Sequence, residues 1–198
     1  MLSEQTIDPN PIEQFRLWLD DARASELAEP DAMTLATASP LCRPSARVVL
    51  LRGLDERGFV FFTNYESAKG HELEKNPHAA AVFYWGKLQR QVRIEGSVSK
   101  VAPEESDAYF ESRPRGHRLS AWASAQSTVI PSREYLESRV ASFDSEFAGH
   151  DIERPPYWGG YRITPERIEF WQGRPDRLHD RFLFTRSAER WHMERLSP

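Results

Sequence analysis

The feature that most constrains the fold is a series of short apolar segments between residues 32 and 101, separated by turn signals. These turn signals leave connections of hairpin length. The segments predict strands over 32–38, 45–54, 58–64, 79–85 and 89–101, interrupted by one short helix over 67–75. Strands that follow one another through hairpin loops favour an antiparallel sheet, closed as a barrel with helices outside. A parallel sheet is disfavoured, because helices do not alternate with strands.

The flanking segments add one helix before this region and further helices and strands after it. Helical spacing of apolar residues predicts a helix over 11–28, whose buried face is formed by Ile12, Phe15, Trp18, Leu19 and Ala22. Later helices are expected over 103–112, 117–124 and 132–147, and later strands over 158–164, 167–172, 180–186 and 190–196. No repeat or long linker divides the chain. We therefore expect one mainly β (α+β) domain over 1–198, with 1–10 as a flexible N-terminal tail.

Composition and charge restrict the functional class. The chain has 198 residues and a formal net charge of −4, so general attraction to nucleic acid is not expected. No apolar run is long enough to cross a bilayer, and the N-terminus lacks a signal-peptide pattern. Cys42 is the only cysteine and cannot form an internal disulfide, which favours a reducing, cytoplasmic location. The six histidines include no i, i+4 pair, so no metal site is predicted.

Arginine dominates the basic residues, with 22 Arg against 4 Lys. A guanidinium suits phosphates and carboxylates, although codon bias explains such an excess equally well. The most informative arginines are Arg177 and Arg181, which flank His179. If this segment is extended, the three side chains share one strand face and need an anionic or aromatic ligand across them. A solvated edge strand is the alternative, and the upstream Trp171 could equally pack in the core.

Two further segments could bind an anion. Arg47 and Arg52 stand at the two ends of an apolar stretch, but in a regular strand they would face opposite sides, so a bulge or two separate partners would be needed. Ser67 begins a predicted helix whose free amides and positive dipole end could hold a phosphate beside Lys69. An ordinary serine cap is the simpler explanation of this second pattern.

Other polar side chains suit ring edges or phosphates, with solvent as the alternative in each case. Gln91 lies on the polar face of a predicted strand, where its amide could meet the edge of a flat ring. Tyr109 and Arg113 are four residues apart on one helix face and could clamp a phosphate. Gln126 and Ser127 lie in a predicted loop and are uninformative alone.

Taken together, these segments resemble the pyridoxamine 5'-phosphate oxidase family from about Pro11 to Pro198. The motifs keep the family's order and spacing: Arg90-Gln91-Val92, Ser112-Arg113-Pro114-Arg115, Gln126-Ser127, Trp171-Gln172-Gly173, Arg177-Leu178-His179-Asp180-Arg181 and Glu194-Arg195-Leu196. The resemblance implies an FMN-binding split β-barrel and a homodimer with active sites at the subunit interface. The implied reaction oxidises a B6 vitamer phosphate to pyridoxal 5'-phosphate, with hydride transfer to the flavin and O2 as the final acceptor, giving hydrogen peroxide.

The resemblance also implies residue roles by position. The implied FMN contacts are Arg47, Val48, Leu50, Arg52, Phe62, Thr63, Lys69, Gln91, Gln126, Ser127, Trp171 and Arg181. Within this set, Trp171 and Arg181 would reach the flavin from the partner subunit. The implied substrate contacts are Arg52, Tyr109, Arg113 and His117 at the phosphate, with Arg177 and His179 at the pyridine ring. Arg177 and His179 are thus the catalytic candidates, expected to position the substrate and stabilise charge rather than to act as an acid–base pair.

The sequence departs from the family pattern in a few places. Arg52 stands where Lys is usual, Ala68 replaces a frequent Arg, and His117 occupies a site usually held by Ser. Before Asp8 there is no counterpart of the Arg-containing lid segment that many family members carry. These departures bear on phosphate geometry and on closure over the substrate.

Two alternative functions stay open from the sequence. One is a flavin oxidase of the phenazine-biosynthesis type on the same barrel, against which Tyr109, Arg113 and the Arg177/His179 pair argue. The other is a carrier that binds flavin or pyridoxal phosphate without turnover, which oxygen uptake would distinguish. A nucleic-acid-binding barrel is disfavoured by the acidic balance.

Overall fold

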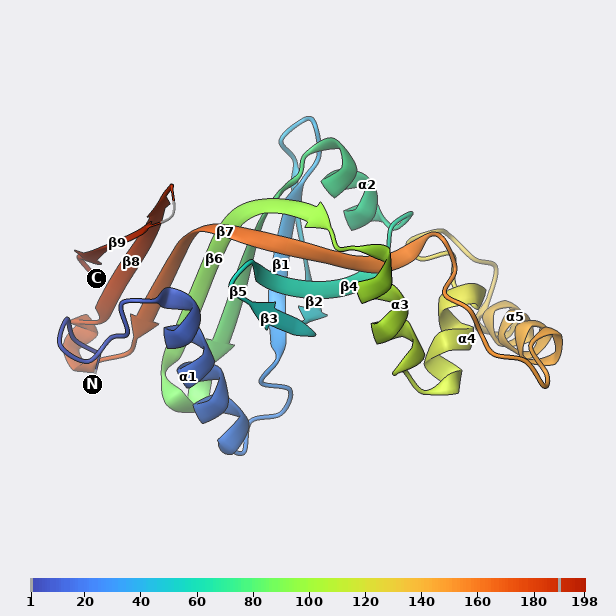
Figure 1. Cartoon of the computed structure of the whole chain (residues 1–198), viewed down its shortest axis with the longest axis horizontal. Helices are drawn as coiled ribbons and strands as arrows, with labels where there is room; N and C mark the ends of the chain where they lie inside the picture. Colours follow the sequence, from blue (N-terminus) through green and yellow to red (C-terminus); the bar gives the residue numbers. More distant parts are fainter. Residues whose placement is uncertain (1, 189) are drawn as a thin grey trace.

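A computed structural model describes residues 2–188 and 190–198, and Figure 1 labels its elements. The described strands form a nine-stranded antiparallel sheet in the order β2-β1-β5-β6-β7-β4-β3, with β8 paired to β7 and β9 to β8. Their bounds are β1 (Ala32–Ala38), β2 (Pro44–Leu50), β3 (Gly53–Asp55), β4 (Gly58–Asn64), β5 (His78–Trp85), β6 (Arg90–Lys100), β7 (Trp158–Gln172), β8 (Asp180–Ser187) and β9 (Arg190–Leu196). The expected mainly β, antiparallel architecture is confirmed.

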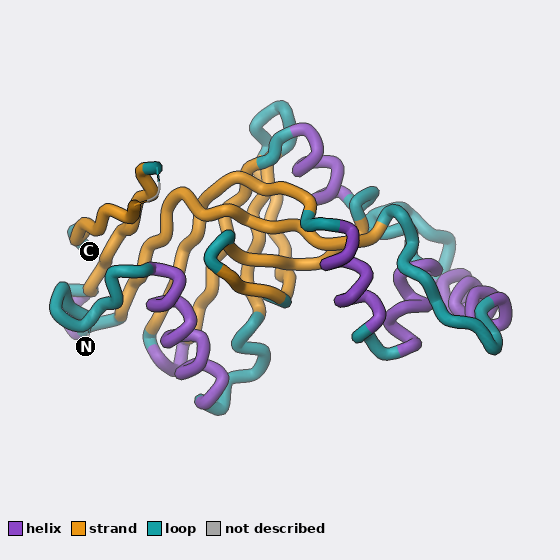
Figure 2. The backbone as a smooth tube through the Cα atoms, viewed as in Figure 1, coloured by secondary structure: helices purple, strands orange, loops and turns teal. Residues whose placement is uncertain are grey.

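Helices lie at the periphery of this sheet (Figure 2). In the described part of the chain they are α1 (Pro11–Ala24), α2 (Ala68–Lys75), α3 (Pro103–Glu111), α4 (Arg115–Ala123) and α5 (Arg133–Glu146), with 3-10 turns η1 (Gly86–Leu88) and η2 (Pro175–Arg177). Helix α1 ends earlier than the expected residue 28, because Ser25 is already extended. None of the described helices is long and apolar enough to cross a membrane.

One edge of β7 is shared by two strands, and this splits the barrel. Along its other edge β7 pairs with β6 over almost its whole length. The shared edge pairs with β4 from Trp158 to Ile163 and with β8 from Arg167 to Gln172. The two strands expected over 158–164 and 167–172 are therefore one strand. A register shift between Glu95 and Gly96 absorbs the irregularity opposite Pro165, which has no amide hydrogen to donate.

The apolar stretch 45–54, by contrast, forms two strands rather than the single one expected. β2 pairs with β1 and β3 pairs with β4, so the chain changes partners at Leu51 and Arg52. At this point the Leu51 amide donates to the Asp31 carbonyl at 2.9 Å, and the Arg52 amide donates to the Val60 carbonyl at 2.8 Å. Pairing with two different edges, which local sequence does not encode, breaks the strand.

The barrel core is rich in phenylalanine and is covered by α1. The ring of Phe15 meets Phe59 and Phe83 edge-on, each at 4.9 Å between centroids. Trp18 meets Phe170 edge-on at 5.3 Å. Burial of each such side chain contributes about 1.5–3 kcal/mol, so the predicted apolar face of α1 fixes this helix on the barrel.

The segment before α1 is not the flexible tail that we expected. Leu2 and Ile7 are buried in the same core as α1, and Glu4 forms an ion pair with Arg195 on β9. Figure 1 shows the two termini at the same end of the molecule, beside β8 and β9. Two isolated apolar residues give no periodic signal, so the sequence could not show this packing.

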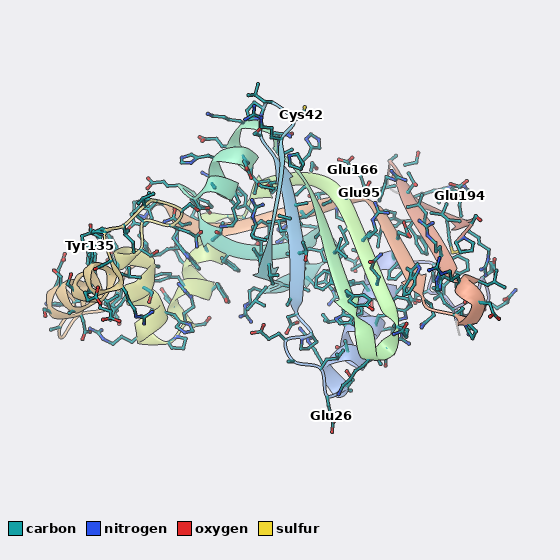
Figure 3. All side chains as sticks on the ribbon, turned by 180° about the vertical axis from the view of Figure 1, so that it is seen from behind. Glu26, Cys42, Glu95, Tyr135, Glu166 and Glu194 are labelled. Atoms are coloured by element: carbon teal, nitrogen blue, oxygen red, sulfur yellow. The ribbon has the colours of Figure 1, made fainter. Side chains whose placement is uncertain are left out.

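Helices α3, α4 and α5 form a second, smaller cluster at the end of the molecule opposite the termini (Figure 1). Its buried residues are Phe110, Leu119, Ala121, Ile152 and Trp158. Because Trp158 begins β7, this cluster is continuous with the barrel. Cys42 lies exposed on the turn between β1 and β2, away from both cores (Figure 3).

Candidate active site

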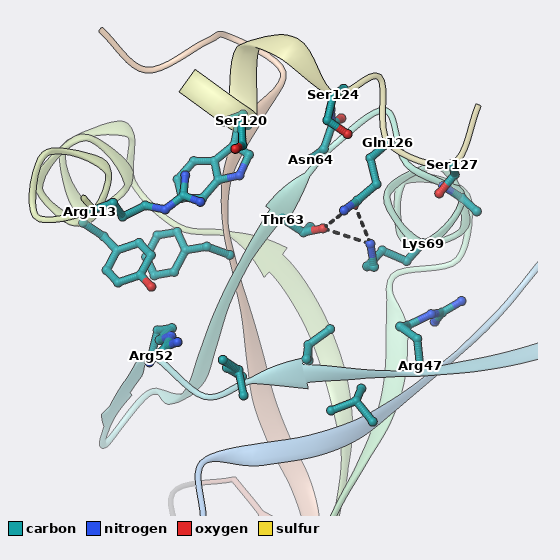
Figure 4. A pocket seen from close by; sticks show the side chains of 18 residues that line it. Arg47, Arg52, Thr63, Asn64, Lys69, Arg113, Ser120, Ser124, Gln126 and Ser127 are labelled. Atoms are coloured by element: carbon teal, nitrogen blue, oxygen red, sulfur yellow. Dashed lines mark hydrogen bonds between the residues drawn. The ribbon is translucent and has the colours of Figure 1, made fainter. Parts of the chain in front are cut away.

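A cavity of about 680 Å³ lies where β2, β4 and α2 meet the helical cluster (Figure 4). Most of the residues expected at a cofactor or substrate phosphate line it. They are Arg47, Val48, Leu50, Arg52, Phe62, Thr63, Lys69, Tyr109, Arg113, Gln126 and Ser127. The structure thus brings together residues from segments that are up to eighty positions apart in the sequence.

One end of the cavity is built around Lys69, in the first turn of α2. Its Nζ donates to the Gln126 side-chain oxygen at 2.8 Å and to the Thr63 hydroxyl at 3.0 Å. The Ala68 amide donates to the Ser127 hydroxyl at 3.2 Å, so the loop after α4 is tied to the start of α2. Burial, and secondly the nearby Arg47 charge, lower the pKa of Lys69 to about 8. An anion bound here would offset both effects.

Arg47 reaches this end of the cavity from β2 and is held by Glu72 of α2. Their ion pair has an N–O distance of 3.2 Å, and the Glu72 carboxylate also accepts from the hydroxyls of Ser45 and Thr37. Burial alone would raise the pKa of Glu72, but these hydrogen bonds and the Arg47 charge lower it overall. Arg47 is therefore fixed in place before any ligand binds.

The other end of the cavity contains Arg113, which has no carboxylate partner in the described chain. Its guanidinium lies over the Trp158 ring, 4.6 Å from the centroid, and its buried Nη1 has no hydrogen-bond partner. Burial lowers the pKa of Arg113, and the Arg52 charge adds to this effect while Tyr109 opposes it. A buried donor left unsatisfied is costly, so this end of the cavity is suited to bind an anion.

An aromatic wall lies at the Arg113 end of the cavity (Figure 4). The Phe62 ring stacks on Tyr109 at 4.0 Å and lies 5.6 Å from Trp158, with interplanar angles of 19° and 13°. These stacked rings make the Arg113 end both aromatic and cationic, while Lys69 and Arg47 make the other end cationic. Such a cavity suits a planar molecule carrying phosphate.

The break between β2 and β3 explains how Arg47 and Arg52 can line the same cavity. A continuous strand would have pointed them to opposite sides. Because β2 ends at Leu50 and the chain turns before Gly53, both arginines line the same cavity.

A second group of expected site residues lies outside the cavity, on the outer face of the sheet. Strand register places Gln91 opposite Trp171, and Trp171 opposite Arg181, in one row across β6, β7 and β8. Their neighbours Val92, Phe170 and Phe182 are fully buried, so the row faces away from the core. The His179 ring lies 4.7 Å from the Trp171 ring. Within one chain, the expected site residues form two groups.

The segment around Arg177 is not extended, so the condition for a shared strand face is not met. Pro175 to Arg177 form η2, and both Asp176 and Arg177 have positive φ angles, of 57° and 61°. Strand β8 begins only at Asp180, so Arg177, His179 and Arg181 do not share a strand face. Arg181 instead donates through Nε to the buried Glu169 carboxylate at 2.8 Å.

Some cavity residues were missed and one expected residue lies elsewhere. Trp158, Asn64, Ser120 and Ser124 line the cavity without having been identified. The glycines after Trp158 were an available signal: a Cβ at Gly159 would lie 2.1 Å from the Tyr65 hydroxyl, so this strand is closely approached. His117 is exposed on α4 and is not among the lining residues.

Comparison with known proteins assigns the family. Residues 19–146 match the family model described as pyridoxamine 5'-phosphate oxidase, and residues 158–198 match the pyridoxine 5'-phosphate oxidase C-terminal dimerisation region. The chain belongs to the pyridoxamine 5'-phosphate oxidase family. The resemblance found in the sequence is thereby confirmed, and the chain is an oxidoreductase.

Two relatives named pyridoxine/pyridoxamine 5'-phosphate oxidase are similar over almost the whole chain. The protein of Paraburkholderia phymatum is 61% identical over 193 residues, covering 97% of this chain and 91% of its own length. The protein of Rubrobacter xylanophilus is 57% identical over 197 residues, covering 100% of this chain and 91% of its own.

Two solved structures share the fold. PhzG from Burkholderia lata, in complex with tetrahydrophenazine-1-carboxylic acid, has a TM-score of 0.94 and 32% identity, covering 100% of this chain and 98% of its own. A pyridoxamine 5'-phosphate oxidase-related, FMN-binding protein from Nostoc punctiforme has a TM-score of 0.75 and 20% identity, with the same coverage. The second likeness concerns the fold alone, and it agrees with the expected split barrel.

Proposed function

We propose that this oxidase uses FMN to convert pyridoxamine 5'-phosphate, pyridoxine 5'-phosphate or both to pyridoxal 5'-phosphate, with O2 as electron acceptor and hydrogen peroxide as product. The observation that carries this proposal is one cavity with two separate cationic ends and an aromatic wall at one of them. Two phosphate-bearing aromatic molecules bound side by side require such an arrangement. The naming of the relatives at 57% and 61% identity supports the same substrate class.

The Lys69 end fits the phosphate of FMN. Lys69 and Arg47 supply positive charge, while Gln126 and Ser127 supply polar side chains that are already held in place. Burial and, secondly, the Arg47 charge lower the pKa of Lys69, and a bound phosphate would oppose both effects. Phe62, Thr63, Val48 and Leu50 would line the rest of the cofactor.

The Arg113 end fits the substrate phosphate. The orphaned Nη1 of Arg113 would gain an acceptor, and Arg52 and the Tyr109 hydroxyl lie on the same cavity wall. The greater bulk of Arg52 relative to a lysine leaves less room here but offers a bidentate fork. His117 would join this phosphate only if its side chain turned toward the cavity, so its contribution depends on closure around the ligand.

The outer-face row of Gln91, Trp171 and Arg181, with Arg177 and His179, would complete the site in a homodimer. None of these residues lines the cavity, and the paired ends of β7 and β8 lie away from β4 and the helical cluster (Figure 1), so a second copy of the chain would bring them to the cavity. The match of residues 158–198 to a dimerisation region supports this arrangement. In the dimer, Trp171 and Arg181 would contact the flavin, while Arg177 and His179 would hold the pyridine ring.

The residues of this chain act mainly by position and charge. The two phosphate ends set the separation and the orientation of the two ligands, which favours a reactive alignment. The aromatic wall excludes water from the Arg113 end of the cavity. Arg177 places a fixed positive charge beside the substrate ring and can stabilise negative charge that develops there. Bound flavin supplies the two-electron acceptor that the side chains of this chain lack.

Oxygen consumption tests the proposal directly. Protein loaded with FMN is supplied with pyridoxamine 5'-phosphate, and pyridoxal phosphate is followed by its absorbance. We expect turnover that is lost with unphosphorylated pyridoxamine, because the Arg113 end then has no anion to bind. If the protein binds flavin and is yellow but leaves the vitamer unchanged, the fold and cofactor assignments stand and the proposed reaction is wrong.

A phenazine-type oxidase is the second candidate, favoured by the TM-score of 0.94 to PhzG. Its carboxylic ligand also carries negative charge, so fold and charge alone do not separate the two functions. The higher identity to the B6 oxidases favours our proposal. Oxygen uptake with a dihydrophenazine carboxylate, but not with the vitamer phosphate, would reverse the choice. Binding of flavin without turnover of either compound would instead indicate a carrier.

A further inference from the structure

The loop between β7 and β8 carries Arg177 and His179, and its base is held by a chain of ion pairs that begins at the N-terminus. The chain runs from Glu4 to Arg195 on β9, then to Asp180 at the start of β8, and finally to Arg174 inside the loop. Figure 1 shows both termini beside this loop, at the end of the molecule away from the cavity.

The first ion pair of this series, between Arg195 and Glu4, is bidentate. Arg195 donates to the two Glu4 oxygens from Nε at 2.7 Å and from Nη2 at 3.0 Å. The remaining Arg195 nitrogen, Nη1, donates to Asp180 Oδ1 at 2.9 Å. The other Asp180 oxygen accepts from Arg174 Nε at 2.7 Å. Every carboxylate oxygen in the chain is therefore occupied by an arginine donor.

Glu4 is presented from a fixed backbone, which distinguishes it from an ordinary surface acid. Leu2 and Ile7, on either side of it, are 6% and 7% exposed and belong to the barrel core. Arg195 is likewise fixed, because its guanidinium lies 4.4 Å from the centroid of the fully buried Phe182 ring. Holding both partners rigid lowers the entropy cost that usually weakens exposed pairs.

The last link of the chain reaches His179 itself. Asp180 anchors the Arg174 side chain, and the Arg174 backbone amide donates to His179 Nδ1 at 3.1 Å. In the neutral imidazole this places the proton on Nε2, so Nε2 is the donor available to a ligand. The position of Arg174 thus sets both the ring orientation and the tautomer of His179.

We propose that residues 2–7 form a strut for the catalytic loop, in which Glu4 and Asp180 are positioning residues that act on His179 through Arg195 and Arg174. This inference rests on the proposed function for the role of His179. The N-terminal segment of this chain then orders the loop through these ion pairs.

Amide hydrogen exchange in residues 174–180 of the full-length protein tests the strut without using activity. Glu4→Gln keeps the size of the side chain and removes its charge, and we expect exchange in this loop to become at least about 3-fold faster. Arg195→Lys should behave in the same way, because one ammonium cannot bridge Glu4 and Asp180. The matched control is Glu137→Gln, which removes a similarly exposed partner of Arg133 on α5.

Steady-state kinetics give the second measurement. We expect Glu4→Gln to lower kcat for the vitamer phosphate by about 3- to 5-fold and Asp180→Asn by more than about 10-fold, with wild-type FMN content and a similar melting temperature for Glu4→Gln. Unchanged loop exchange in Glu4→Gln would overturn the strut. If the protein has no oxidase activity but Glu4→Gln still speeds exchange in the loop, the strut stands and the proposed reaction is refuted.

Discussion

At the cavity, Arg52 and Arg113 form no ion pair with any carboxylate of the described chain, whereas at the β7–β9 end Arg93, Arg181 and Arg195 are each bound to one or two. The same residue type therefore has two physical states. A guanidinium that is paired with a fixed carboxylate stabilises the fold, and its attraction for an anionic ligand is weak because the charge is already neutralised. A buried guanidinium without such a partner is costly until an anion arrives. On the proposed function, the unpaired arginines that line the cavity, Arg52 and Arg113, are the ones that bind the substrate phosphate.

Arg47 lies between these two states, since it is paired with Glu72 and still lines the cavity. Its hydrogen bonds hold it in the orientation that a cofactor phosphate would need. This difference predicts that unpaired arginines affect ligand affinity most, and that paired ones affect it through position.

Replacement of Arg113 should have the largest effect. Arg113→Ala removes the unpaired cation, and charge-assisted hydrogen bonds contribute about 1.5–3 kcal/mol each. We expect KM for the vitamer phosphate to rise about 10- to 100-fold with little change in FMN content. The control is Arg115→Ala, because Arg115 is already paired with Asp144 and lies outside the cavity lining. A loss of FMN in place of the rise in KM would show that Arg113 serves the other ligand.

Replacement of Arg181 should have an intermediate effect on the cofactor. Arg181→Ala removes a flavin contact, while the buried Glu169 keeps Arg93 as a partner at 3.1 Å, so the fold should survive. We expect FMN to bind about 10-fold more weakly, measured by quenching of flavin fluorescence. Arg167→Ala, which breaks an exposed pair with Glu95, is the comparison. Equal flavin content in both variants would contradict the placement of Arg181 at the ring.

The smallest effect concerns pH. The pKa of Lys69 is lowered from 10.5 to about 8, so between these values the folded chain binds fewer protons than the unfolded chain. The resulting penalty to stability is present below about pH 8 and is relieved as pH rises toward 10.5. Phosphate binding has the opposite dependence, because it needs the charged amine.

We therefore expect FMN affinity, measured by titration, to fall by up to about 10-fold from about pH 7 to about pH 9. Lys69→Met should bind more weakly at neutral pH and lose most of this dependence. If FMN affinity falls equally with pH in Lys69→Met, the titrating group is not Lys69.

Several elements could be predicted from sequence because their signals are local. The apolar periodicity of α1 and the short strands from Ala32 onward gave the antiparallel barrel. Features set by long-range pairing were not predictable in this way. The break at Leu51 arises because β2 and β3 pair with different edges, and the continuity of β7 past Pro165 depends on one extra residue in β7 itself, since the consecutive residues Glu95 and Gly96 of β6 face Arg167 and Pro165.

The candidate site shows the same division. Resemblance in separated motifs identified the residues that line the cavity, but it could not identify the groups that hold them. Glu72, which fixes Arg47, and Trp158, on which Arg113 stacks, belong to segments that carry no chemical motif. The start of β8 at Asp180 was predicted, but the sequence left open whether Arg177 and His179 are extended, and the 3-10 turn η2 answers this question for Arg177.

Strand β7 begins at Trp158 in the cavity wall and ends beside Trp171 in the outer-face row. Thirteen residues of extended chain span on the order of 40 Å. In the proposed dimer, each chain would therefore carry two half-sites at a fixed spacing, and each half-site would be completed by the other chain. Mixing an Arg113→Ala chain with an Arg181→Ala chain should consequently produce heterodimers in which one site is doubly damaged and the other is fully wild type. Two impaired preparations would then regain activity when combined.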